Sequence, residues 1–478
     1  MKWRAWLAAP IALALGGCDF APRYNPPSVA TPPQFKDQSA GGGTLPSSGM
    51  WWLTFHDRTL NDLQSQVDAA NPDLAAAVAA NDAAVARANA ALSSAYPQVD
   101  SVNHFLANKQ SLNRPLRSAS QPLYYGDNLI GAQTSYEIDI WGRVRDLVKS
   151  ANATAEASAD ALADARLELH AELTRDYVNL RGFDDEAKLY ADTIAIYRSA
   201  LNLTQERLKA QIASPVDVDR AQTQLSATEA LASDLALNRA RLEDSIAALV
   251  GKAAASFRIA PSSAPLAMPK PPSAVPADVL RNRPDVAESE RLTAAASEVI
   301  GASRANFFPK VSFLALGGTQ DTNFRLFNPN NLFGTIGPSI DIPLFDAGLR
   351  QAQLAIAKAQ FTEAAERYRA TVLRALQEVQ DQLSSLRWLA EEARETSTAA
   401  AAARRAADLS LTLYRDGASS YLDVVTAQSA ALDAERLEIA LRTRQRVAVI
   451  GLMLALGGGW SAPPEPLAKP RFGPYLAE

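Results

Sequence analysis

The chain has 478 residues and a formal net charge of −5, and this mild acidity gives no reason to expect a nucleic-acid partner. A single cysteine excludes a framework of internal disulfides. The three histidines are scattered and form no ligand spacing, so we expect no metal, no cofactor and no enzymatic activity.

Residues 1–17 are typical of a signal peptide. They combine a positively charged start with an apolar run that is too short to span a membrane as a helix. The run ends in Leu-Gly-Gly-Cys18, which resembles a lipoprotein box, in which the cysteine is lipidated and becomes the mature N-terminus. Acyl chains such as palmitate would anchor Cys18 to a membrane. The alternative is an ordinary signal peptide with a chance cysteine. Asp19 bears on sorting, because in enteric bacteria an aspartate there tends to retain lipoproteins in the inner membrane.

The segment 18–50 is rich in proline, glycine and serine, which predicts an extended, lipidated N-terminal tether. Two structural repeats then follow, at 51–260 and 261–462, and residues 463–478 form a C-terminal tail. Sliding the chain along itself by 206 positions superimposes Ser214 on Ser420, Asp217 on Asp423 and Gln222 on Gln428. Further upstream the offset is 212. A period of this length indicates a duplicated domain.

Each repeat is predicted to contain a long helix, a turn and a return helix. Residues 143 to 210 hold no proline, which suits a continuous helix. Apolar side chains recur there at spacings of three and four, as in helices that pack side by side. About 65–70 residues at roughly 1.5 Å each give a rod of about 100 Å, long enough to cross a periplasm.

Each repeat also holds a pair of predicted strands, at about 98–112 and 128–140 and at about 311–321 and 333–345. Apolar and polar side chains alternate most clearly in the second strand of each pair. A half-buried strand of a soluble sheet has the same pattern. The lengths also suit outer-membrane strands of about 9–11 residues with an apolar face toward lipid.

Four strands cannot close a barrel, and an open sheet edge in lipid leaves backbone groups unpaired. Strands that cross a membrane therefore require an oligomer. Two chains would supply about eight strands, which enclose an interior filled by side chains, and three would supply about twelve. A conducting pore favours a homotrimer.

Several motifs then occur in one order along nearly the whole chain after the predicted signal peptide. They are the Cys18 box, Trp51-Trp52, Asn71-Pro72-Asp73, Tyr96-Pro97, Tyr136 to Arg143, Arg283-Pro284-Asp285, Phe308-Pro309, Pro343 to Gly348 and Tyr414 to Gln428. With these motifs the sequence resembles the TolC family of outer-membrane efflux channels, in its lipoprotein (NodT-type) branch.

The resemblance implies a mainly α fold with a membrane β-barrel part. Duplicated helical hairpins would form a trimeric α-barrel through the periplasm, and four strands per chain would contribute to one shared β-barrel in the outer membrane. The trimer would be a passive exit duct, contacting outer-membrane lipid, for small molecules delivered by an inner-membrane pump and a periplasmic adaptor protein. A type I protein-secretion duct is a rival within the family. A membrane-tethered periplasmic coiled coil without a pore is a rival outside it.

The resemblance also implies a gate where the two helical turns form the periplasmic mouth. The expected gate residues are Tyr414, Arg415, Leu422, Asp423, Thr426 and Asp217. The expected adaptor-facing turn residues are Gln211, Ile212 and Ala213 in the first repeat, and Gly417, Ala418 and Ser419 in the second. The family often has an acidic residue at the position of Thr426, which Asp423 would replace. Capping of the return helices is the alternative role for both aspartates. Gly417 suits a tight turn and its counterpart Gln211 does not, so the two turns need not bind the adaptor alike.

Overall fold

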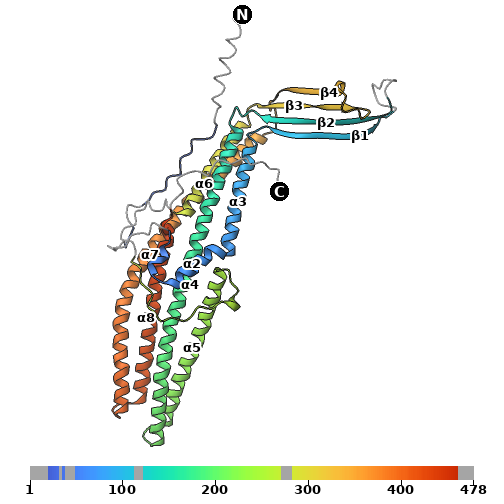
Figure 1. The fold of residues 1–478 in the computed structure, drawn as a ribbon. Coiled ribbons are helices and arrows are strands. Elements are labelled where there is room, and N and C mark those ends of the chain that lie inside the picture. The colour runs from blue at the N-terminus through green and yellow to red at the C-terminus, as the bar shows by residue number, and fades with distance from the viewer. Residues whose placement is uncertain (1–19, 32–34, 38–48, 112–121, 271–282, 461–478) are drawn as a thin grey trace.

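A computed structural model describes residues 20–31, 35–37, 49–111, 122–270 and 283–460 of the chain. The predicted signal peptide, Cys18 and the C-terminal tail 463–478 lie outside the described residues. The molecule is elongated, with a β-sheet at one end and two helical turns at the other (Figure 1).

Two helices of 67 residues each, α4 (Arg143–Lys209) and α7 (Leu349–Arg415), run the length of the shaft. At about 1.5 Å per residue each is about 100 Å long. The return helices α5 (Pro215–Leu249) and α8 (Tyr421–Ala455) have 35 residues each. Among the described residues, no helix combines the length and the apolar character needed to cross a membrane.

The remaining elements complete the two repeats. They are η1 (Trp51–Phe55), α2 (Arg58–Ala70), α3 (Pro72–Ser93), β1 (Gln98–Lys109), β2 (Tyr124–Glu137), η2 (Ala254–Ser256), α6 (Pro284–Ala305), β3 (Lys310–Asp321), η4 (Pro329–Asn331), β4 (Leu332–Asp341) and η5 (Gly457–Gly459). Helices α3 and α6 both have 22 residues, and strands β1 and β3 both have 12. With the equal long helices, these matched lengths confirm the predicted duplication of the helical hairpins.

Helix starts follow local chemistry that the sequence displays. The Asn71 side chain accepts a hydrogen bond from the Leu74 amide, with Pro72 in the first turn. Both 67-residue helices begin after a glycine in the left-handed region, Gly142 at φ 82° and Gly348 at φ 89°. The strand-to-helix joint is therefore built in the same way in both repeats.

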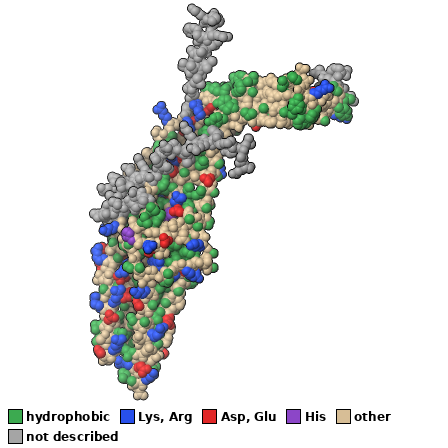
Figure 2. Space-filling model, viewed as in Figure 1, with side chains coloured by type: hydrophobic (Ala, Val, Ile, Leu, Met, Phe, Trp, Pro, Cys, Tyr) green, Lys and Arg blue, Asp and Glu red, His purple; other side chains and the backbone are tan. Residues whose placement is uncertain are grey.

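The strands form one antiparallel sheet in the order β1-β2-β3-β4. The register aligns Tyr136 with Phe313 and Pro338, and Thr134 with Ala315 and Ile336. Residues paired across antiparallel strands share a face, so the predicted apolar faces of the second and fourth strands coincide. Figure 2 shows hydrophobic side chains over the sheet and charged side chains along the shaft.

Three strands have other limits than the alternation of side chains predicts. Strand β1 ends at Lys109 instead of about 112. Strand β2 occupies 124–137 instead of about 128–140, because Tyr124 and Tyr125 still pair with β1. Strand β4 ends at Asp341 instead of about 345. Pro343 lies directly beyond this end and has no backbone N–H to donate to a ladder.

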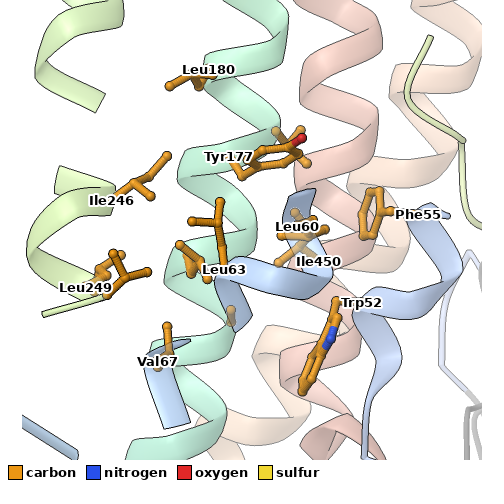
Figure 3. Packing of buried hydrophobic residues seen from close by; sticks show 14 of the residues in the cluster. Trp52, Phe55, Leu60, Leu63, Val67, Tyr177, Leu180, Ile246, Leu249 and Ile450 are labelled. Atoms are coloured by element: carbon orange, nitrogen blue, oxygen red, sulfur yellow. The ribbon is translucent and has the colours of Figure 1, made fainter. Parts of the chain in front are cut away.

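The largest core cluster lies at mid-shaft, where η1 and α2 pack across three long helices (Figure 3). Leu60 and Leu63 of α2 meet Tyr177 of α4 and Ile450 of α8. The buried Gln64 amide donates to the His170 carbonyl at 2.9 Å and to the Thr174 hydroxyl at 2.7 Å. This cluster fastens helices from both repeats to one another, because it joins α4 and α5 with α8.

The described parts of the predicted tether form no helix or strand, but they pack against the second repeat. Phe35 is buried among Val286, Val379 and Leu452. Next to it, the Lys36 amide donates to the Gln380 side chain at 2.8 Å. Near the sheet, the Phe20 ring stacks on Phe308 at 4.6 Å between centroids. The described parts of the tether are thus docked on the second repeat.

Two carboxyl groups of α4 face α6 in a partly buried setting. Burial raises the pKa of Asp160 to about 6 and the pKa of Asp164 to about 7, with Asp285 raising the latter further. The nearby Arg283 is already paired, with Asp285 at 2.7 Å and with Glu378 at 2.8 Å. Both α4 carboxyls therefore cost stability when they ionise.

Replacing Phe35 with alanine is expected to lower the free energy of unfolding by about 3 kcal/mol, because it leaves a cavity in a packed cluster. Phe327→Ala is the matched control, since Phe327 is 96% exposed and Phe35 only 7%. Denaturation followed by circular dichroism measures both. Equal stability of the two variants would show that the tether does not contribute to the folded core.

The raised pKa values predict a pH dependence of stability. A carboxyl whose folded pKa lies above its ordinary value stabilises the fold at low pH, and that contribution is lost as the pH rises through the folded pKa. We expect the Asp164 contribution to disappear between about pH 4 and about pH 7. Asp164→Asn should therefore flatten the fall in melting temperature over this window, whereas Asn at the exposed Asp244 should not. Parallel curves for wild type and Asp164→Asn would contradict this.

Candidate functional site

The two helical turns at the far end of the shaft have the same backbone geometry. The Ile212 amide donates to the Arg207 carbonyl at 2.8 Å, and the Ala418 amide donates to the Leu413 carbonyl at 2.8 Å. Gln211, at φ 58°, and Gly417, at φ 78°, both lie in the left-handed region. The expectation that Gln211 does not suit a tight turn is therefore wrong. Gln211 adopts the conformation despite its side chain, because the same helix-ending hydrogen bonds close both turns.

Asp217 and Asp423 each complete a capping box at the start of a return helix. The Asp423 carboxylate accepts from the Ser420 amide at 3.1 Å, and the Asp217 carboxylate accepts from the Ser214 amide at 3.3 Å. The capping role considered for both aspartates is thus present. Asp423 also remains exposed to solvent.

Arg207 joins the two hairpins, and sequence reasoning missed it. Its guanidinium donates to the Tyr414 carbonyl at 2.7 Å and to the Arg415 carbonyl at 3.3 Å. It also lies over the Tyr414 ring at 4.8 Å. A cation beside the last carbonyls of α7 is favourable in the field of that helix end. The counterpart of Arg207 at the offset of 206 is Leu413. This difference between the repeats is the feature of the sequence that could have pointed to Arg207.

The predicted gate residues divide between the inside and the surface of the protomer. Tyr414 is buried and meets Tyr421 edge-on at 5.2 Å, so within one chain it packs inside the hairpin pair. Arg415, Leu422, Asp423 and Thr426 are exposed. The Thr426 hydroxyl donates to the Leu422 carbonyl at 2.9 Å.

The predicted turn residues also lie mainly at the surface. Ile212 is 67% exposed at the tip of the first turn, and Leu422, just after the second, is 48% exposed. Gln211, Gly417 and Ala418 are exposed, and Ala213 and Ser419 are partly buried. Among the described residues, no group of three or more acidic, histidine or cysteine side chains has a metal-binding arrangement.

A sheet with an apolar face, continued by two duplicated helical hairpins about 100 Å long, defines the class of outer-membrane channels with a helical periplasmic extension. A family model described as outer membrane efflux protein matches residues 63–252 and 275–458, and the chain belongs to this family. It is thus an outer-membrane protein and a channel of the efflux type.

Solved structures and relatives agree with this membership. The outer-membrane channel OprN has a TM-score of 0.87 and 28% identity over 93% of this chain and 100% of its own. The probable efflux pump outer membrane protein TtgC of Pseudomonas putida is 28% identical over 95% of each chain. Nodulation protein T of Rhizobium leguminosarum is 28% identical over 98% of this chain and 96% of its own.

The two turns provide a matched pair of substitutions. Gly417→Gln should lower the free energy of unfolding by about 1 kcal/mol, because a side chain in the left-handed region is strained. Gln211→Gly removes that strain and makes the unfolded chain more flexible, so it should change stability by less than about 0.5 kcal/mol. Chemical denaturation of both variants measures this. A larger loss in Gln211→Gly than in Gly417→Gln would refute the shared backbone geometry.

Proposed function

We propose that three copies of this chain form a passive exit duct for small molecules across the outer membrane. An inner-membrane pump would supply the energy, and a periplasmic adaptor would join the pump to the duct. The observation that carries the proposal is the four-stranded sheet with its apolar face. Its edge strands β1 and β4 have no further strand partner among the described residues, which suits a barrel shared between chains. Similarity to relatives such as the toluene efflux pump outer membrane protein TtgC of Pseudomonas putida supports small-molecule export over protein secretion.

The order of the helices supports lateral assembly. Contacts of α3 with α4, of α4 with α6 and of α6 with α7 follow the order of the strands, so sheet and helices form one continuous wall. Its two margins carry exposed apolar side chains. Val99 of β1 lies at one margin, and Ile336 of β4 and Trp388 of α7, which is 61% exposed, lie at the other. Burial of such surface against a neighbouring copy would be favourable.

The proposed number of three chains follows from the width of the passage that their strands would enclose. Two chains would supply about eight strands, whose interior side chains fill, whereas three supply about twelve and leave room for passage. The chain itself would act without chemistry at a catalytic centre, because a duct only provides a path.

The proposed gate lies at the two turns. In a trimer, Leu422, Asp423 and Thr426 would narrow the mouth, and Arg415 and Tyr414 would hold neighbouring helices together. Asp217 is the equivalent carboxylate of the first repeat. A ring of Asp423 carboxylates would attract cations, and its repulsion would be relaxed by protonation or by adaptor contact. The exposure of Leu422 and Asp423 supports this role.

The proposed adaptor contact is the pair of turns themselves, Gln211 to Ala213 and Gly417 to Ser419. Their shared backbone geometry and the exposed Ile212 support docking of similar partner segments on both. We further propose a lipid anchor at Cys18. Two residues later, Phe20 stacks on Phe308 next to strand β3, which supports an anchor close to the membrane end of the shaft.

Conductance of the purified full chain in planar lipid bilayers tests the function. Wild type should show small, cation-selective closed-state currents, and Asp423→Ala or Arg415→Ala should raise them several-fold because the mouth loosens. Asp408→Ala, at an exposed site of α7 away from the turn, is the control for loss of a charge. Ser420→Ala breaks the cap of α8 while keeping the Asp423 carboxylate.

The outcomes separate the explanations. A leak in Asp423→Ala but not in Ser420→Ala supports a charge-based gate. Equal leaks in both variants would assign the effect to fraying of α8. No ion conductance from the wild-type chain under any condition would refute the duct.

A further inference from the structure

A groove of about 520 Å³ lies between α5 and α8, close to the two turns. Its walls come from the first turns of both return helices, and Tyr197 of α4 contributes to its floor. Both hairpins therefore contribute to one concave surface within a single chain. This volume lies in the range of about 300–1,000 Å³ that holds drug-sized ligands.

The inside of the groove is mainly apolar. Val216 and Leu231 line it from α5, and Val425 and Leu432 line it from α8. Two of these side chains are exposed, Val216 at 52% and Leu231 at 41%. Exposed aliphatic side chains in a concave surface favour an apolar occupant, because burial removes them from water.

The floor contains polar groups whose hydrogen-bonding capacity is not used. The buried Tyr197 hydroxyl and both polar atoms of the Gln224 amide have no hydrogen-bond partner among the described residues. The amide lies near the phenol without hydrogen-bond geometry. Buried polar groups without partners are costly, so a ligand that reaches them gains affinity.

The rim is negatively charged. Asp219 and Asp433 line the groove, and no ion pair engages either carboxylate within the described residues. Arg220 also lines it, but its guanidinium lies 3.6 Å from the Asp217 carboxylate. The net charge around the groove is therefore negative, which favours a positively charged occupant and disfavours an anion.

We propose that this groove is a binding site for an organic monocation with an apolar body of drug size. The apolar body packs between Leu231 and Leu432, and the cationic group lies toward Asp219 and Asp433. The bound molecule contacts both hairpins at once and so holds α5 against α8. Binding itself does not depend on the proposed duct, and only an effect on its opening rests on that function.

Binding of rhodamine 6G, a fluorescent lipophilic cation, to the full chain in lipid nanodiscs tests the site. Fluorescence polarisation is measured against empty nanodiscs, which correct for dye in the lipid. Leu231→Trp fills the groove and should weaken binding at least tenfold. Leu237→Trp places the same side chain at another exposed position of α5 and should leave binding unchanged. Equal affinity of wild type and Leu231→Trp would overturn the proposal.

The charge requirement has its own test. The double variant Asp219→Asn with Asp433→Asn should weaken dye binding about three- to tenfold, while Asp234→Asn on the same helix α5 should not. Nile red, which is neutral, should bind more weakly than rhodamine 6G and should be insensitive to the double variant. Equal sensitivity of both dyes to the double variant would overturn the assignment of a cation.

Two controls keep the outcomes distinct. Circular dichroism and the mass of each variant check that folding and assembly are unchanged, and bilayer conductance checks the channel. Lost dye binding with normal conductance confirms the site separately from the duct. A Leu231→Trp variant that binds dye normally but stops efflux in cells would assign the groove to a protein partner and overturn the proposal.

Discussion

The constraint on which the structure depends is the pairing of backbone groups in the sheet. Strands β1 and β4 lie at its two edges, and neither has a further strand partner within the described residues. In lipid an unpaired edge is costly, so the apolar face and the open edges together require further copies of the chain. The same requirement applies to the shaft, because each long helix follows a strand after a short connection that ends at Gly142 or Gly348. Assembly of the sheet therefore determines how the hairpins are arranged around any central passage.

Duplication explains most of the shaft. The two repeats differ at the helical turns. Equal helix lengths and shared turn geometry give the two hairpins the same form. Arg207 breaks the equivalence, because it binds the end of α7 while its counterpart Leu413 offers no such contact. Near the turns the hairpins are held together by Arg207 and by an apolar cluster that includes Tyr197, Tyr414 and Tyr421. At mid-shaft a larger apolar core joins them.

Local chemistry made much of this fold predictable. The proline-free long helix and the alternation of apolar and polar side chains along the strands depend on residues near one another in sequence, and both predictions are confirmed. The contacts that sequence reasoning missed join distant segments. Phe35 enters a core of α6, α7 and α8, and Arg207 reaches carbonyls more than 200 positions away. The left-handed Gln211 was missed for another reason, since the helix-ending hydrogen bonds outweighed the preference of its side chain.

The mass of the purified protein is the most direct measure of whether several chains share one barrel. Light scattering of the full chain in detergent, corrected for bound detergent, gives the number of copies in the particle. We expect three chains, which together supply about twelve strands and close one barrel. A stable monomer would leave both edges of the sheet open, would contradict the shared barrel, and would favour a membrane-tethered coiled coil without a pore.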